Sequence, residues 1–284
     1  MLSYDRPVRE LIRARKSWRS FTGESLSRAI QKKIEERIST MGPSPFGSKL
    51  RFALIEAGVE GRKSVRGTYG VIRGATHFLA GTVQKGDMAF EDFGYAFESL
   101  ILFATSLGLG TCWLGGTLNR SMFGKSMEVK NNELMPAISP VGHAAHRRSI
   151  VDSFFYLSAG SKNRKPWKTL FFLNDFSTPL SDAKAGEYAV PLEMVRLAPS
   201  AVNRQPWRIV SRDGAFHFYL CRSGGHVSLF KEVDLQRIDM GIAMFHFHSS
   251  ALESGLKGAW QIIDPGISPL PLKTSYQVSW IPGT

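Results

Sequence analysis

The chain has 284 residues, of which 43% are hydrophobic and 21% charged, as in an ordinary globular protein with a full core or two lobes. These values exclude a collagenous, a disulfide-scaffold and a wholly disordered protein. A net charge of +12 favours anionic partners, such as nucleic acid, acidic lipid or phosphorylated small molecules. The basic residues form short scattered clusters without an arm or a zinc finger, so nucleic acid is not the expected partner.

The start of the chain carries charged residues and lacks the apolar core of a signal peptide. The two cysteines, Cys112 and Cys221, lie far apart and have no metal-binding spacing. A reducing cytoplasm is therefore the expected location.

A basic string, Arg-Lys-Ser-Trp-Arg at residues 15–19, follows the first helical pattern. Its guanidinium groups could hold a phosphate bidentately, and its hydroxyl could bind a ribityl chain or a ring edge. The alternative is a solvated basic helix end, which the helix dipole stabilises. On this string alone the alternative is favoured.

The next elements are a helix and two strands. Residues 26–38 carry isoleucine at every fourth position with charges between, which predicts an amphipathic helix capped by Ser25 or Ser27. Short apolar runs predict strands at residues 51–56 and 76–81.

A long helix buried on most sides is predicted for residues 92–107. The apolar stretch 93–118 is not expected to cross a membrane, because Glu98 lies inside it and glycines interrupt its second half. Residues 108–116, Gly-Leu-Gly-Thr-Cys-Trp-Leu-Gly-Gly, would let backbone N–H groups approach a flat ligand. An ordinary glycine C-cap is the alternative, and Cys112 is expected to be a buried packing thiol.

The string His-Ala-Ala-His-Arg-Arg at residues 143–148 ends the first half of the chain. Its histidines are expected to be solvated loop residues, because no carboxylate or cysteine lies near them to complete a metal site. Arg147 or Arg148 is a candidate second clamp for a phosphate. Residues 162–187, rich in Pro, Ser and Asp, are predicted to be a connector.

Four elements are predicted in the second half: strands at residues 208–211 and 215–222, a buried helix at 235–254 and a terminal strand at 276–280. The first two strands form a hairpin around Asp213-Gly214. His246 and His248, two positions apart on the helix, face different sides and are expected to be structural.

The loop at residues 198–208 reads Ala-Pro-Ser-Ala-Val-Asn-Arg-Gln-Pro-Trp-Arg. Two prolines fix its backbone, while Ser200 and Asn203 offer donors and acceptors just before a strand. A structural proline turn is the alternative. The length and unusual composition of the string favour a binding loop.

Three strings of the first half recur in order in the second. Residues 15–19 recur at 164–168 and residues 42–44 at 198–200. The longest match has an offset of 147 (239 − 92) and pairs Asp92, Gly94, Ala96, Ala104, Gly108, Leu109 and Trp113 with Asp239, Gly241, Ala243, Ala251, Gly255, Leu256 and Trp260. The intermixed elements predict an α+β fold. The repeats predict two lobes, residues 1–155 and 156–284, related like a fused dimer.

These strings resemble the nitroreductase family. Its members carry Arg-x-Ser-x-Arg near the N-terminus, a Gly-Leu-Gly-Thr-Cys-Trp turn, a late basic residue and a Pro-Ser-x-x-Asn-x-Gln-Pro-Trp loop. The second half looks like the single-chain, internally duplicated branch, and the resemblance covers nearly the whole chain. It implies a nitroreductase-like α/β/α sandwich whose two tandem lobes form an intramolecular pseudo-dimer.

In ordinary relatives two subunits build two FMN sites at their interface, one giving the Pro-Ser loop and the other the remaining strings. Here the first lobe has Gly47 where the asparagine would stand, and the second has Pro166 in place of the serine and residues 257–260 in place of the glycine turn. The resemblance therefore implies one intact FMN site. Its residues would be Arg15, Lys16, Ser17, Arg19, Trp113, Leu114, Gly115, Gly116, Arg147, Arg148, Pro199, Ser200, Ala201 and Asn203.

The implied activity is hydride transfer from NAD(P)H to a small electrophilic acceptor, such as a nitroaromatic or a quinone. The route is ping-pong through FMN, with no catalytic side chain and no metal. The arginines would neutralise the phosphate, and backbone N–H groups of residues 114–116 would face the ring. Substitution of Arg15 should weaken flavin retention, whereas substitution of Arg164, its counterpart in the lost site, should not.

Two other functions remain open at this point. One is a non-catalytic protein that binds flavin or another phosphorylated ligand, and the other is nucleic-acid binding. The resemblance implies a monomer that acts as a pseudo-dimer on a small-molecule substrate, with neither nucleic acid nor a membrane as partner.

Overall fold

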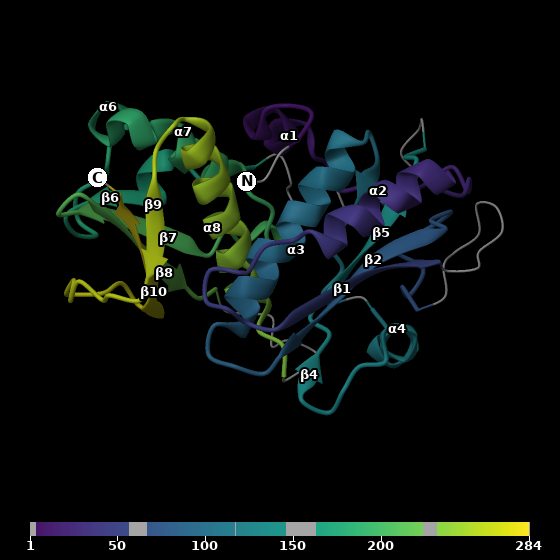
Figure 1. Ribbon diagram of the computed structural model, residues 1–284. Coiled ribbons are helices and arrows are strands. Elements are labelled where there is room, and N and C mark those ends of the chain that lie inside the picture. The colour runs from purple at the N-terminus through teal and green to yellow at the C-terminus, as the bar shows by residue number, and fades with distance from the viewer. Residues whose placement is uncertain (1–3, 57–66, 117, 146–162, 224–231, 284) are drawn as a thin grey trace.

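The computed structural model describes residues 4–56, 67–116, 118–145, 163–223 and 232–283. Two long helices, α3 (Ala89–Ser106) and α8 (Leu235–Glu253), cross at the centre, and a sheet lies on either side of the pair (Figure 1). Each sheet has five strands among the described residues. The mixed α+β fold class expected from the sequence is confirmed.

The first sheet belongs to the first half of the chain and is covered on both faces. Helices α2 (Arg28–Ser39) and α3 pack on one face, and α4 (Arg120–Met127) packs on the other. Strand β2 is buried along almost its whole length, as expected for a strand enclosed between two layers. The strand order is β1 (Leu50–Glu56), β2 (His77–Gln84), β5 (Ile138–Gly142) and β3 (Gly110–Thr111), with β4 (Glu133–Leu134) beside β2, all antiparallel.

The second sheet belongs to the second half, with α7 (Ala189–Leu197) and α8 beside it. Asp213 and Gly214 both have positive φ, 51° and 76°, which suits the tight turn of the predicted β7–β8 hairpin. The strand order is β6 (Phe171–Leu173), β7 (Trp207–Arg212), β8 (Ala215–Cys221), β10 (Thr274–Pro282) and β9 (Gly258–Gln261), antiparallel except for β6 and β7.

The helices and strands predicted from periodicity are confirmed, with boundaries shifted by a few residues. The cap of α2 is Ser27, whose hydroxyl oxygen accepts from the Ile30 N–H at 3.3 Å. The prediction that residues 162–187 are only a connector is wrong. This stretch contains the edge strand β6, the 3₁₀ helices at Trp167–Thr169 and Gly186–Tyr188 and the helix α6 (Asp182–Ala185).

The crossing of α3 and α8 depends on two glycines, Gly94 and Gly241, which the sequence repeat pairs with each other. A Cβ added to Gly94 would lie 2.2 Å from the Ile238 carbonyl oxygen, and one added to Gly241 would lie 2.0 Å from the Glu91 carbonyl oxygen. Both positions therefore exclude every side chain, and the backbones of the two helices are in direct contact.

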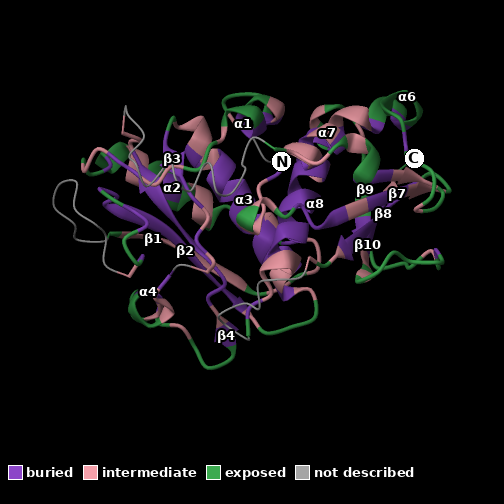
Figure 2. Cartoon of the chain, turned by 180° about the vertical axis from the view of Figure 1, so that it is seen from behind, coloured by how far each residue is buried: buried purple, intermediate pink, exposed green. Residues whose placement is uncertain are grey.

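The apolar core is continuous between the two halves. One cluster contains Phe93 and Phe97 of α3 together with Phe247 of α8 and Trp207 and Trp280 of the second sheet. Figure 2 shows buried residues running from the first sheet through α3 and α8 to the second sheet. The short helix α1 (Val8–Ala14) covers the junction, where it packs on α3, α7 and α8. No helix among the described ranges has the length and apolarity needed to cross a membrane.

A half-buried histidine at this junction, His248, makes the stability of the fold depend on pH. His248 Nδ1 lies 2.7 Å from the Tyr95 hydroxyl, and burial lowers the pKa of His248 from 6.5 to about 4. Between these values the unfolded chain binds a proton that the folded chain does not. The contribution of this site is therefore complete above about pH 6.5 and decreases as the pH falls toward 4, by at most about 3 kcal/mol.

Urea denaturation at pH 7.5 and pH 5.0 measures this dependence. The wild-type protein is expected to lose more stability between the two pH values than His248→Asn, which keeps a polar partner for Tyr95 and does not titrate. Equal losses in the two proteins would contradict the assignment to His248.

Candidate functional site

The basic string lies along the edge of the first sheet, beside the glycine turn. Ser17 pairs with Thr111 of β3 as a parallel bridge, and the Trp18 N–H donates to the Thr111 carbonyl oxygen at 2.8 Å. Further along, the Phe21 N–H donates to the Arg73 carbonyl oxygen at 2.9 Å. The backbone of residues 17–21 thus acts as an added edge strand, which places the string next to residues 110–113.

The segment that follows β5 reaches the same part of the chain. The Ala145 N–H donates to the Ser20 carbonyl oxygen at 3.0 Å. The structure therefore brings the start of the late basic string to the first one. Arg147 and Arg148, predicted to clamp a phosphate, lie outside the described residues, as does His146.

Arg15 is a buried cation at the C-cap of α1. Its side chain is only 8% exposed, and its Nε lies 4.0 Å from Glu98 Oε1, beyond hydrogen-bond distance. Among the described residues this Nε has no hydrogen-bond partner. Lys16 and Ser17 are exposed and Arg19 is half-buried, so the string presents one buried and several accessible donors.

Glu98, on α3, lies beside Arg15 but is engaged elsewhere. It is fully buried, accepts from Trp113 Nε1 at 2.7 Å and lies 2.9 Å from His246 Nε2 on α8. His246 Nδ1 lies 2.9 Å from the Met194 carbonyl oxygen, which can only accept, so Nδ1 carries a proton. Both carboxylate oxygens of Glu98 are thus engaged by Trp113 and His246, and neither makes a hydrogen bond to Arg15 Nε.

The first part of the glycine turn is fixed by the protein itself. The Trp113 ring packs edge-on against Phe97, with centroids 4.7 Å apart, and so faces the core. Leu114 is buried, and its N–H donates to the Ile138 carbonyl oxygen at 2.9 Å. Of the three N–H groups predicted to face a ring, that of Leu114 is thus used within the sheet.

The two glycines that follow lie at the border with the second half. A Cβ on Gly115 would lie 2.5 Å from Leu235 Cδ2, at the first residue of α8. A Cβ on Gly116 would meet no atom within 4 Å. The Gly115 carbonyl oxygen accepts from Arg120 Nη2 at 2.6 Å. The backbone N–H groups of Gly115 and Gly116 are the candidate donors for a flat ligand at this turn.

The loop at residues 198–208, called the Pro-Ser loop below, follows α7 and is anchored to α8. The Ala201 N–H donates to both carboxylate oxygens of Asp239, at 2.9 and 3.2 Å, and the Gln205 N–H donates to Ser200 Oγ at 2.9 Å. Burial raises the pKa of Asp239 well above its usual range. Pro199 and Ala201 are half-buried beside this anchor.

The counterpart of Asp239 in the sequence repeat, Asp92, holds the corresponding loop of the first half. Its carboxylate accepts from the Phe46 N–H at 3.0 Å and from the Ser48 N–H at 2.9 Å. The repeat therefore pairs two aspartates that perform the same structural task on two different loops.

The Pro-Ser loop has an unusual backbone. Val202, Asn203 and Gln205 have φ values of 44°, 54° and 49°, in the left-handed region. This region is especially unfavourable for a β-branched residue such as Val202, whose side chain is also 56% exposed. Such strain is typical of binding loops that the surrounding structure holds in place.

Arg164 connects this loop to the neighbourhood of Arg15. Its Nη1 donates to Asn203 Oδ1, and its Nη2 donates to the Leu197 carbonyl oxygen at 2.9 Å. Burial, together with the nearby charges of Arg15 and Arg196, lowers the pKa of Arg164 to about 10. This contact was not predicted from the sequence, because the repeat pairs Arg164 with Arg15 and so places it in the other site.

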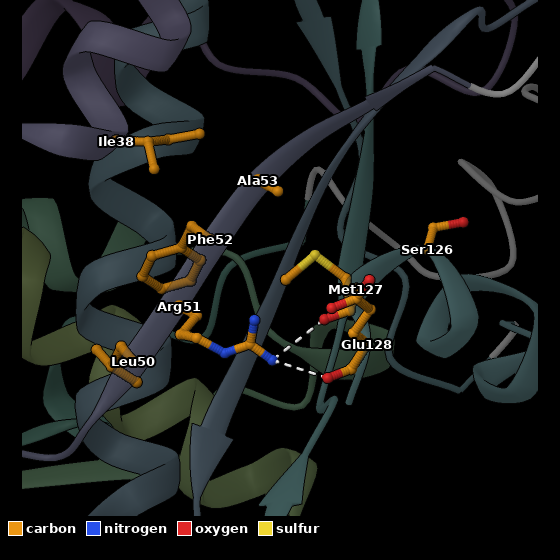
Figure 3. A pocket seen from close by; sticks show the side chains of 8 residues that line it. All are labelled: Ile38, Leu50, Arg51, Phe52, Ala53, Ser126, Met127 and Glu128. Carbon is orange, nitrogen blue, oxygen red and sulfur yellow. Dashed lines mark hydrogen bonds between the residues drawn. The ribbon is translucent and has the colours of Figure 1, made fainter. Parts of the chain in front are cut away.

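A hollow of about 510 Å³ lies elsewhere, between β1 and the end of α4 (Figure 3). Arg51 at this hollow donates to the carbonyl oxygens of Met127 and Glu128, at 3.1 and 3.2 Å, and pairs with Glu133 at 2.7 Å. None of the residues predicted for the site is among those that line it, which are Ile38, Leu50, Arg51, Phe52, Ala53, Ser126, Met127 and Glu128. We therefore place the candidate site at the junction of the two halves. No group of metal-ligating side chains occurs among the described residues.

The two sheets around crossed helices, with the basic string beside the glycine turn, define an α+β protein of the nitroreductase type. The chain belongs to the family described as "Putative TM nitroreductase", whose model matches residues 7–251. This membership identifies it as an oxidoreductase and confirms the resemblance noted in the sequence. A crystal structure of a "putative nitroreductase" from Thermotoga maritima is 19% identical and has a TM-score of 0.61, covering 98% of this chain and 95% of that one.

Shorter nitroreductases match half of the chain. A nitroreductase with bound FMN from Desulfitobacterium hafniense is 23% identical, covering 50% of this chain and 90% of that one, with a TM-score of 0.39. Another with bound FMN, from Bacteroides fragilis, is 20% identical, covering 51% and 92%, with a TM-score of 0.41. No curated protein matches this chain.

Proposed function

We propose that the protein is an FMN-dependent oxidoreductase that transfers hydride from NAD(P)H to a small electrophilic acceptor, such as a nitroaromatic or a quinone. Membership of the nitroreductase family supports the reaction class. The observation that carries the proposal is Arg15, a buried guanidinium whose Nε has no hydrogen-bond partner among the described residues. A buried guanidinium whose nearest carboxylate, Glu98, directs its hydrogen bonds to other residues favours an anionic ligand.

The residues at the junction fit a phosphorylated flavin. Arg15 would bind the phosphate, with Lys16 and Arg19 adding positive charge and the accessible Ser17 hydroxyl meeting the ribityl chain. Gly115 and Gly116 present backbone without side chains at the end of the glycine turn. Asn203, on the loop of the second half, completes the set through its link to Arg164.

When bound, FMN supplies the hydride chemistry, and the protein supplies binding, orientation and electrostatics. Arg15 would neutralise the phosphate, and the glycine N–H groups would donate to the ring. Glu98 directs its hydrogen bonds to Trp113 and His246, which leaves the Nε–H of Arg15 available to the ligand. No side chain is required to act as an acid or a base, and no metal takes part.

We further propose that each chain is a duplicated unit with lobes at residues 1–155 and 156–284 and one flavin site. The paired glycines at the helix crossing and the paired aspartates that anchor the two loops support this arrangement. Such a chain would act as a monomer, because both halves of the site are present in it.

The absorption spectrum of freshly purified protein tests the function. A bound yellow flavin that NAD(P)H bleaches and a quinone restores is the expected result. Flavin that NAD(P)H does not reduce would favour the non-catalytic flavin-binding alternative. Protein that binds no FMN when it is added would refute the proposal.

The substitution Arg15→Met tests the phosphate contact. We expect it to raise the Kd for FMN by about 10- to 100-fold, the loss of one charge-assisted hydrogen bond. The Kd for riboflavin, which lacks the phosphate, should change little. Both constants are measured by quenching of flavin fluorescence.

The matched control is Arg13→Met, in the exposed last turn of α1. It removes the same charge from the same helix and should leave both constants nearly unchanged. Equal effects of the two substitutions would show that only the overall charge of this region matters.

A further inference from the structure

Residues 163–165 are attached to the Pro-Ser loop by several hydrogen bonds. Asn203 Nδ2 donates to the Asn163 carbonyl oxygen at 3.0 Å, and Gln205 Nε2 donates to the same oxygen at 3.3 Å. The Lys165 N–H donates to Gln205 Oε1 at 2.8 Å. Together with the bond from Arg164 to Asn203, these contacts hold Asn203 and Gln205, two of the three loop residues in the left-handed region.

The bond from Arg164 determines how the Asn203 amide is oriented. A guanidinium only donates, so the amide atom that faces it must be the oxygen. Gln205 Nε2 also donates to this oxygen, at 3.2 Å. Asn203 therefore turns its oxygen toward Arg164 and its nitrogen away from it.

The geometry also requires an arginine at this position. One guanidinium reaches two acceptors on different elements, Asn203 Oδ1 in the loop and the Leu197 carbonyl oxygen in the last residue of α7. A lysine has a single nitrogen at the end of a flexible chain and cannot reproduce this fork. A second cation close to Arg15 is electrostatically unfavourable, so its two bonds must offset that repulsion.

We propose that Arg164 is a positioning residue of the flavin site, which holds the Pro-Ser loop and the Asn203 amide in the orientation that meets the flavin. This inference rests on the proposed function. It assigns an arginine of the second half, the counterpart of Arg15 in the repeat, to the retained site. It therefore reverses the expectation from sequence that substitution of Arg164 leaves flavin retention unchanged.

The test compares Arg164→Lys, which keeps the charge but not the fork, with the wild-type protein. We expect Arg164→Lys to raise the Kd for FMN and for riboflavin alike, by about tenfold, since the loop contacts parts that both flavins share. In a protein that already carries Asn203→Ala, the same substitution should raise both Kd values less than twofold, because Arg164 acts through Asn203. The exposed Arg204→Lys, in the same loop, is the matched control and should bind as the wild type does.

Three outcomes would overturn the assignment. Wild-type affinity in Arg164→Lys would show that only the charge matters. A loss confined to FMN would make Arg164 a direct phosphate ligand, and an equal loss with and without Asn203 would show that the two act independently. Failure of the wild-type protein to bind either flavin would instead refute the proposed function.

A second variant covers the case in which Arg164→Lys does not fold. Asn203→Asp keeps an oxygen for Arg164 but removes the amide nitrogen. We expect Asn203→Asp to lose about as much riboflavin affinity as Asn203→Ala does. Riboflavin is the ligand used because it has no phosphate for the new negative charge to repel. Wild-type riboflavin affinity in Asn203→Asp would show that the amide orientation plays no part.

Discussion

Replacement of Gly241 by valine is expected to prevent the two halves of the chain from packing. A Cβ at this position would lie 2.0 Å from the Glu91 carbonyl oxygen and 2.8 Å from the Tyr95 nitrogen. Both are backbone atoms of α3, so no side-chain rotation can relieve the overlap, and the helices would have to separate. We expect a loss of at least about 4 kcal/mol in the free energy of unfolding, measured by urea denaturation.

Gly124→Ala provides the matched control. Gly124 also lies within a helix, α4, but a Cβ there would be 3.6 Å from Val129 Cγ2, an ordinary contact. This substitution should leave stability unchanged or raise it by up to about 1 kcal/mol, because alanine favours helix more than glycine does. If Gly241→Val lowered the free energy of unfolding by less than about 1 kcal/mol, that result would contradict the close helix crossing.

The second large effect is expected at Glu98. Glu98→Ala removes the partner of Trp113 Nε1 and of His246 Nε2, both of which lie in the interior. Unpaired buried groups of this kind lower the free energy of unfolding by about 3–5 kcal/mol. Urea denaturation of the variant measures the loss.

Glu98→Gln should lower the free energy of unfolding much less, by roughly 1 kcal/mol. The glutamine oxygen can accept from Trp113, and its NH₂ group can donate to a neutral His246, whose Nδ1–H is already used by Met194. A glutamine variant as unstable as the alanine variant would show that the carboxylate charge is needed at this place.

The long elements of the fold could be predicted from sequence because their patterns are local. The buried helices α3 and α8 show as extended apolar runs, and the Asp213-Gly214 pair marks the β7–β8 turn. The edge strand β6 could not be predicted, since its three residues are a strand only through their pairing with Ile209, Val210 and Ser211 of β7. Helix α4 is short and mostly polar, so its sequence gives no clear periodicity.

The site was predictable only in part. The strings proposed to form it are visible in the sequence, but which of their atoms are free to bind is decided by contacts between distant residues. The N–H of Leu114, for example, is used by Ile138 within the sheet. For Glu98 there was a signal, since a carboxylate within an apolar helix requires a buried partner. That this partner is His246, 148 residues later, follows only from the helix crossing.

The link between Glu98 and His246 has a consequence for how such a chain can evolve. With the repeat offset of 147, Glu98 corresponds to Phe245 and Ser99 to His246. Two identical subunits would carry the same residues on both sides of their axis, so any acid–imidazole contact would occur twice. In a single polypeptide each position mutates alone, and a polar pair can arise on one side while the other side stays apolar.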